Sequence, residues 1–177
     1  MKIAAQDSAR SRRARRSETI ILFSVANQMF AVAAESVQEI RSTDSLSGAA
    51  NEIEQPLVAK VRHTLDRAHK LYYIVNGCAH FGLRVSRPTL VLIFRQLRVA
   101  LLVDKIERMA EISAIYPLPR AFAGEERCWY RGLAYVEDHV IPVVQPTGFL
   151  THDEFRLLDR SPKATPPQPE MEGALPG

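Results

Sequence analysis

Residues 11–36, SRRARRSETIILFSVANQMFAVAAES, decide how the rest of the chain is interpreted. An arginine cluster precedes a mostly apolar stretch, an order that fits either a secretory signal or a basic arm followed by a hairpin. A signal core needs roughly 7–15 uninterrupted apolar residues. Here Ser24 and Asn27 interrupt the run. The stretch therefore predicts two strands, Ile20–Val25 and Met29–Ala33, joined by a turn.

Basic residues are concentrated at the N-terminus. Residues 1–17 contain six basic side chains against Asp7, a net charge of +5, so residues 18–177 sum to −2 of the total +3. We expect residues 1–17 to be a disordered arm that could hold anionic lipid or nucleic acid. Arg12 and Arg13 leave a twin-arginine export signal as the less favoured alternative, and the broken apolar run favours a cytoplasmic protein.

The length and composition allow one domain or two small ones. The chain has 177 residues, of which 46% are hydrophobic, and this is enough for a real core. Residues 159–177 include the proline-rich run that starts at Ser161 and contain few large apolar side chains. They are predicted to be a disordered tail.

Residues that could carry catalysis or hold a metal do not form a recognisable motif. The two cysteines, Cys78 and Cys128, form no CxxC pair, so a zinc site is not expected. His80 lies two residues from Cys78, but no third group is identified that would orient a nucleophile. The five histidines are expected to face solvent or to be hydrogen-bonded. We expect no enzyme activity, no cofactor, no metal and no small-molecule substrate.

The rest of the chain predicts further short strands and two helices. A helix is expected over residues 57–65, where apolar residues follow Pro56 at helical spacing. A second is expected over 147–158, with Thr151 as an internal start signal, whereas residues 78–88 read as a loop. The further strands are Leu71–Val75, Thr89–Phe94, Val99–Val103, Met109–Ile115, Gly132–Val136 and Val140–Val144. Polar residues between two apolar runs predict a second hairpin from Thr89–Phe94 and Val99–Val103, and a third from the last two strands, which flank the turn Glu137–His139. Many short strands without alternating helices predict small barrels or sandwiches.

Three strings along the chain occur in an order that resembles a known family. They are VQEIR at 37–41, RVALLVDKIERMAEI at 98–112 and YRGLAYVEDHVIPVV at 130–144. Each is moderately specific alone, and the three together are similar to the CheW-like domain, the coupling module of bacterial chemosensory arrays. The resemblance covers roughly residues 18–158.

The resemblance implies a mainly β fold of two five-stranded SH3-like barrels packed together, with a short helix between them and a C-terminal helix. Residues 18–84 are expected to form mainly the first barrel and residues 89–145 mainly the second, followed by the helix at 147–158. Members of the family exchange strands between the barrels, so a clean linear boundary is not expected.

The resemblance also implies a function. It predicts a non-enzymatic adaptor that couples the regulatory domain of a CheA-type histidine kinase to a chemoreceptor cytoplasmic tip, another array component or other CheW-like proteins. The alternative is a small β-barrel protein that binds nucleic acid or anionic membrane through the arginine-rich arm. The partner-binding residues expected from the resemblance are Val37, Glu39, Arg41, Arg67, Asp104 and Gly132.

The chain departs from the family at the N-L-R-G motif, where DRAHKLYYIVNG stands at 66–77. The family's arginine, which lies near the glutamate of VQEIR, falls here on Ala68, with Arg67 one residue away. A one-residue offset on a strand sends a side chain to the opposite face. We therefore expect Glu39 to be a free acceptor, available to a cationic partner side chain.

Overall fold

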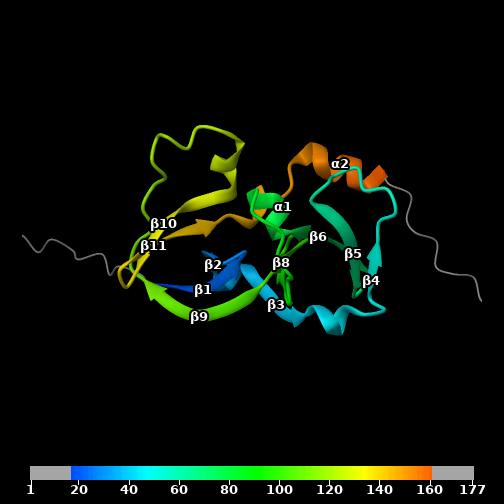
Figure 1. The fold of residues 1–177 in the computed structure, drawn as a ribbon, viewed down its shortest axis with the longest axis horizontal. Helices are drawn as coiled ribbons and strands as arrows, with labels where there is room; N and C mark the ends of the chain where they lie inside the picture. Colours follow the sequence, from blue (N-terminus) through cyan, green and yellow to red (C-terminus); the bar gives the residue numbers. More distant parts are fainter. Residues whose placement is uncertain (1–16, 161–177) are drawn as a thin grey trace, which may run out of the picture.

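The structure is a computed structural model, and it describes residues 17–160. The predicted arm, apart from Ser17, and the tail from Ser161 onward lie outside the described residues. Within them, eleven strands form two sheets, which occupy the two halves of the molecule in Figure 1. The expectation of a mainly β fold is confirmed.

Sheet B is formed by six consecutive strands, and the strands of sheet A come before and after them in the chain. Sheet A has the order β10-β11-β2-β1-β9 and sheet B the order β3-β7-β8-β6-β5-β4. The strands of sheet A are β1 (Glu18–Val25), β2 (Gln28–Ala33), β9 (Lys105–Ile112), β10 (Tyr130–Val136) and β11 (His139–Val144). Those of sheet B are β3 (Val37–Ser42), β4 (Ala50–Glu52), β5 (Val61–Arg67), β6 (Lys70–Asn76), β7 (Leu90–Phe94) and β8 (Val99–Val103).

The three predicted hairpins β1–β2, β7–β8 and β10–β11 are all present as antiparallel pairs. In the first, Ala26 and Asn27 both have positive φ, 49° and 63°, as a two-residue hairpin turn requires. Strand β9 starts at Lys105 and ends at Ile112, several residues earlier than the predicted Met109–Ile115.

The helix predicted at 57–65 is wrong. Val61 and Leu65 lie in β5, where both are fully buried. Their spacing of four residues is typical of one helix face, but both residues can equally be buried in a strand. In β5 a bulge between Val61 and His63 shifts the alternation, so Val61 packs in the central core and Leu65 in the core inside sheet B. The spacing alone could not distinguish a helix from a strand.

The prediction of a loop at 78–88 is wrong over its first residues, which form the helix α1 (Gly77–Phe81). The Asn76 side chain caps this helix by accepting from the backbone N–H of Ala79 at 3.0 Å, and Gly82 ends it with a left-handed φ of 65°. Helix α1, rather than residues 57–65, is the short helix that lies between the two halves in Figure 1.

Helix α2 (His152–Arg160) is the predicted C-terminal helix, displaced to later residues. Thr151 is its start signal: its hydroxyl accepts from Glu154 N, and the Glu154 carboxylate accepts from Thr151 N. None of the helices within residues 17–160 is long and apolar enough to cross a membrane.

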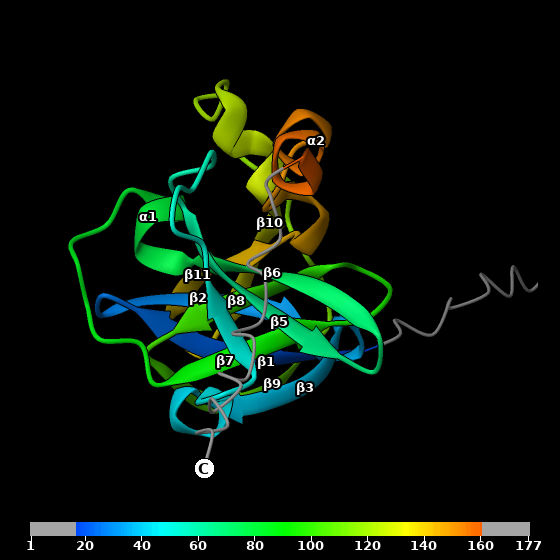
Figure 2. The same cartoon turned by 90° about the vertical axis from the view of Figure 1, so that its right-hand side faces the viewer.

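A polar cluster fastens α2 to sheet B, above β5 and β6 in Figures 1 and 2. The Asp159 carboxylate accepts two bonds from Arg98, at 2.9 and 2.8 Å, and one from the Tyr73 hydroxyl at 2.6 Å. The Arg98 and Tyr73 bonds lower the pKa of Asp159 to about 2. Burial, followed by the hydrogen bond to Asp159, raises the pKa of Tyr73 to about 12.

The alternation of side chains along the strands divides the core into three parts. Ile20 and Leu22 of β1 face a small core inside sheet A, while Ile21, Phe23 and Val25 face the opposite way into a large central core. The side chains of β6, β7 and β8 likewise alternate between the large central core and a small core inside sheet B. Because both faces of these strands are buried, their sequences are continuously apolar rather than alternating.

The chain crosses between the sheets twice. Strands β1 and β2 pair with β9–β11, whereas β7 and β8 pair with β3–β6. The ranges 18–84 and 89–145 therefore do not correspond to the two sheets. Sheet B has six strands where five were expected, the additional one being the three-residue strand β4.

Asp104 lies at the second crossing, between β8 of sheet B and β9 of sheet A. Its carboxylate accepts from the backbone N–H of Ala26 at 2.7 Å and from the Ser86 hydroxyl at 2.5 Å. Its own backbone N–H donates to Ser24 O, and its carbonyl accepts from the Thr89 hydroxyl. Asp104 thus joins the first hairpin, the crossing point and the loop that precedes β7.

We expect Asp104→Ala to lower the free energy of unfolding by about 1–3 kcal/mol, because two partly buried donors lose their charged acceptor. Urea unfolding followed by circular dichroism measures this. The matched control is Asp138→Ala in the exposed turn between β10 and β11, which should change stability by less than about 0.5 kcal/mol. Equal effects of the two substitutions would show that Asp104 does not hold the crossing together.

Candidate partner-binding site

Strand β3, which carries VQEIR, is the edge strand of sheet B and pairs only with β7. A bulge between Val37 and Glu39 interrupts this pairing. Val37 is buried in the central core, whereas Glu39 and Arg41 lie half-exposed along the edge and Ile40 is exposed. A bulge at a sheet edge redirects side chains, and Glu39 directly follows this one.

Glu39 forms an ion pair with Arg67, the last residue of β5, at 2.6 Å between Oε2 and Nη2. Strands β3 and β5 are separated by three strands in the order of sheet B, so this contact requires the sheet to curl until its two ends approach. The ion pair therefore spans the seam of a small barrel. The prediction that Glu39 is a free acceptor is wrong.

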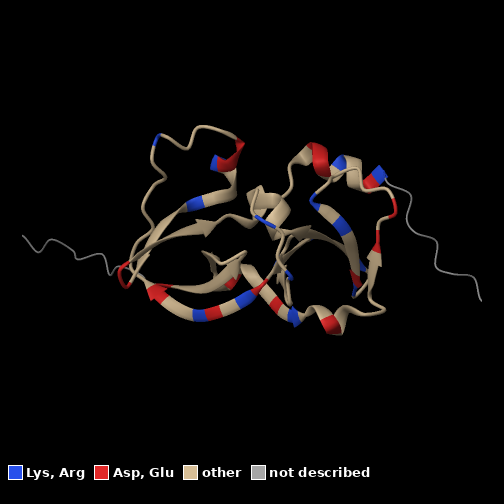
Figure 3. Ribbon diagram, in the orientation of Figure 1, with Lys and Arg blue, Asp and Glu red and all other residues tan. Residues whose placement is uncertain are grey.

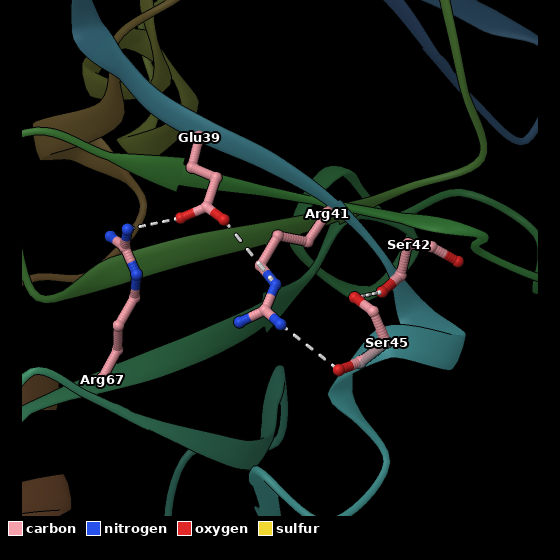
Figure 4. Close-up of polar contacts among 5 residues, drawn as sticks. All are labelled: Glu39, Arg41, Ser42, Ser45 and Arg67. Atoms are coloured by element: carbon pink, nitrogen blue, oxygen red, sulfur yellow. Dashed lines mark hydrogen bonds and ion pairs between the residues drawn. The ribbon is translucent and has the colours of Figure 1, made fainter.

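Arg41 completes the group on the same side of the seam, as Figure 4 shows. Its Nε lies 3.8 Å from the second carboxylate oxygen of Glu39, and its Nη2 donates to the backbone carbonyl of Ser45 at 3.3 Å. We call Glu39, Arg41 and Arg67 the seam triad.

The seam triad is partly shielded from water: the side chains of Glu39, Arg67 and Arg41 are 34%, 32% and 28% exposed. Glu39 Oε2 itself is buried and receives no hydrogen bond of good geometry, so its contact with Arg67 is an ion pair rather than an aligned hydrogen bond. Two cations therefore face one carboxylate, which leaves the triad with a net positive charge toward a partner.

The other predicted site residues lie elsewhere. Val37 belongs to the central core and Asp104 to the crossing between the sheets. Gly132 is buried in β10 of sheet A, at a bulge, where a Cβ atom would collide with the carbonyl oxygen of Tyr116. The structure thus brings together three of the six predicted residues, Glu39, Arg41 and Arg67.

Sequence reasoning missed an exposed apolar face on sheet A. Tyr135 and Val140 are opposite each other in the β10–β11 pair, and they are 59% and 52% exposed. The ring of Tyr116, which bridges to β10 through Leu133, packs edge-on against Tyr135 with centroids 5.1 Å apart. The predicted hairpin has a three-residue turn, Glu137–His139, which would place Val136 opposite Val140. The observed turn is one residue shorter, and this brings Tyr135 opposite Val140.

The expectation for the histidines is wrong for His80. Its side chain is buried in α1, and neither ring nitrogen has a hydrogen-bond partner among the described residues. The expectation fails because it treats residues 78–88 as a loop. The helix caps Asn76 and Gly82 are the sequence signal that indicates α1. Within residues 17–160, no three His, Cys, Asp or Glu side chains group as metal ligands.

Charges of both signs are interspersed over the described domain. Residues 18–160 contain 16 basic and 17 acidic side chains, a net charge of −1. Along β9, acidic and basic residues follow one another closely, as Figure 3 shows. A surface of this kind does not provide the basic stripe that nucleic-acid binding requires.

The seam ion pair should couple Glu39 and Arg67 in stability. In a double-mutant cycle of Glu39→Gln and Arg67→Gln, we expect a coupling free energy of about 0.2–1 kcal/mol, because the pair is one-third exposed. Urea unfolding at low salt measures it. The control cycle combines Arg67→Gln with Glu125→Gln on the sheet A side and should give no coupling. A zero value for both cycles would restore Glu39 as a free acceptor.

Comparisons with known proteins bear on the fold. No protein-family model matches the sequence, and no curated protein sequence matches it. Among solved structures, the scaffolding protein TtCheW from Thermoanaerobacter tengcongensis aligns with a TM-score of 0.64 at 16% sequence identity. The alignment covers 77% of this chain and 95% of that chain. The chain has a CheW-like fold.

Proposed function

We propose that this chain is a non-enzymatic, cytoplasmic scaffold of a chemosensory array that couples a CheA-type histidine kinase to a chemoreceptor or another array component. The observation that carries the proposal is the fold, because TtCheW, described as a scaffolding protein, matches over nearly its whole length. The string VQEIR is a second line of support, because it resembles the family's signature at the level of sequence. It also supplies two residues of the seam triad, Glu39 and Arg41.

The proposal assigns the seam triad to one partner. Glu39, Arg41 and Arg67 contact the receptor tip or the other array component, and the exposed Ile40 adds an apolar contact between them. The net positive charge of the triad favours a partner that presents a carboxylate there. Val37, Asp104 and Gly132 act indirectly, by shaping the strands that carry the surface.

The exposed apolar face of sheet A is assigned to the kinase regulatory domain. Tyr135 and Val140 lie in the β10–β11 hairpin, which Figure 1 shows at the opposite end of the molecule from β5, the strand of Arg67, and Tyr116 packs against Tyr135. Both partners can therefore bind at once. Tyrosine is enriched among the residues that dominate binding energies, because it buries a large area and loses little conformational freedom.

We expect a purified CheA-type regulatory domain from the same genome to bind the full chain saturably in calorimetry. Tyr135→Asp should weaken this binding about tenfold or more, because it places a charge in an apolar contact. The matched control is Val85→Asp on the loop before β7, where Val85 is 96% exposed, and it should leave the affinity unchanged.

The salt dependence of the same titration separates the alternative function. Barrel-to-barrel pairing should lose little affinity between low and high salt, whereas an arginine arm that neutralises phosphates loses it steeply. Absence of heat with the regulatory domain, together with salt-sensitive binding of DNA or anionic vesicles that requires residues 1–17, would overturn the scaffold proposal.

A further inference from the structure

His80 is enclosed by aromatic rings from three segments of the chain. The ring centroids of Trp129 and Phe149 lie 4.4 and 5.1 Å from that of His80, and Phe81 follows it in α1 at 4.9 Å. The imidazole is only 3% exposed, and both of its nitrogens lack a hydrogen-bond partner among the described residues. A buried polar group left unsatisfied is unfavourable and requires an explanation.

The surroundings of His80 tolerate only its neutral form. Burial, with a smaller effect from the ammonium of Lys60, lowers the pKa of His80 to about 3. The neighbouring charges are engaged elsewhere: Lys60 pairs with Glu154 at 2.9 Å. In the 3-10 helix Glu125–Trp129, Glu126 accepts from Gly124 N and Arg127 donates to Phe122 O. Among residues 17–160, no carboxylate is therefore placed to stabilise an imidazolium.

One side of this enclosure is weakly held. Trp129 ends the connection 113–129 between β9 and β10, and every hydrogen bond made by residues 117–128 has both partners inside that stretch. The hydrogen bonds that join the connection to the rest of the described chain are those of the Tyr116–Leu133 bridge and one from Gln145 N to Trp129 O at 2.7 Å. Its other contacts are packing contacts, such as those of the Phe122 ring with Tyr130 and of the Trp129 ring with Phe81. Phe149, by contrast, is fully buried in the central core.

We propose that His80 is a proton-operated latch. Its neutral ring holds Trp129 and the connection 113–129 against α1, and protonation releases them while both sheets remain folded. In the released state the imidazolium reaches water through the opening that Trp129 leaves.

Release alters a groove of about 270 Å³ beside α1. Leu118 and Phe122 of the connection line this groove together with Phe30 and Phe81. When the connection is released as the pH falls, Leu118 and Phe122 leave the groove and an apolar surface is uncovered. The latch thereby makes the exposure of that surface depend on pH. This goes beyond the scaffold proposal and does not rest on it.

The size of the effect follows from proton linkage. The released imidazole takes a proton near its ordinary pKa of about 6.5, and the enclosed one only near 3. The ratio of released to latched molecules therefore rises about tenfold for each pH unit between about 6.5 and about 3. Above a pH of about 7, the ratio of released to latched molecules does not change with pH.

Two probes report the release directly. Trp129 is the only tryptophan of the chain, so its fluorescence and its quenching by acrylamide report its exposure. The Gln145 amide reports the same event by hydrogen exchange, because release breaks its bond to Trp129. After correction for the intrinsic exchange rate, we expect its protection to fall about tenfold per pH unit below 6.5.

His80→Phe should remove this pH dependence, because the ring stays apolar at every pH, and His80→Leu serves in its place if the phenylalanine is too large. The exposed His139→Phe is the matched control and should retain the dependence. Protection of Gln145 that does not vary with pH would overturn the proposal, as would an unchanged dependence in both His80 variants. A parallel loss of protection in β7 and β8 would overturn it too, since global unfolding alone would then explain the result.

Discussion

The structure depends on the two crossings of the chain between its sheets. The chain leaves sheet A after β2, builds sheet B from β3 to β8, and returns at Asp104 to complete sheet A with β9–β11. Sheet B is one continuous segment of the chain, whereas sheet A is completed only after it. The largest core lies between the two sheets and takes side chains from both. The carboxylate of Asp104 supports this arrangement by binding the first hairpin and the loop before β7 at the point of return. The two halves therefore form one body with a fixed relative orientation.

A fixed body of this kind suits a scaffold. The seam triad lies on sheet B and the apolar face of Tyr116, Tyr135 and Val140 on sheet A, so the two partners that we propose for these surfaces would be held at a set distance. The Glu39–Arg67 pair contributes little to stability because it is partly exposed. In the function that we propose, its larger effect is on recognition, since it fixes where charge is presented along the seam of sheet B.

The strands could be predicted from the sequence because apolar and β-branched runs separated by turn residues are a local signal. The helix at 57–65 was wrong because the spacing of Val61 and Leu65 fits a strand equally well. Glu39 was misjudged for a non-local reason. Arg67 is the last strand residue before a turn in which Ala68 and His69 have positive φ, and it reaches Glu39 only because sheet B curls. No spacing rule describes that closure, whereas α1 could have been found from Asn76 and Gly82.

In the function that we propose, one molecule holds a kinase and a second array component at the same time. Sedimentation velocity of the chain mixed with a CheA-type regulatory domain and a chemoreceptor cytoplasmic tip tests it most directly. The account predicts one faster species that contains all three components, formed from either binary complex. Displacement of the receptor tip by the kinase domain would contradict it, because the two partners would then compete for one surface.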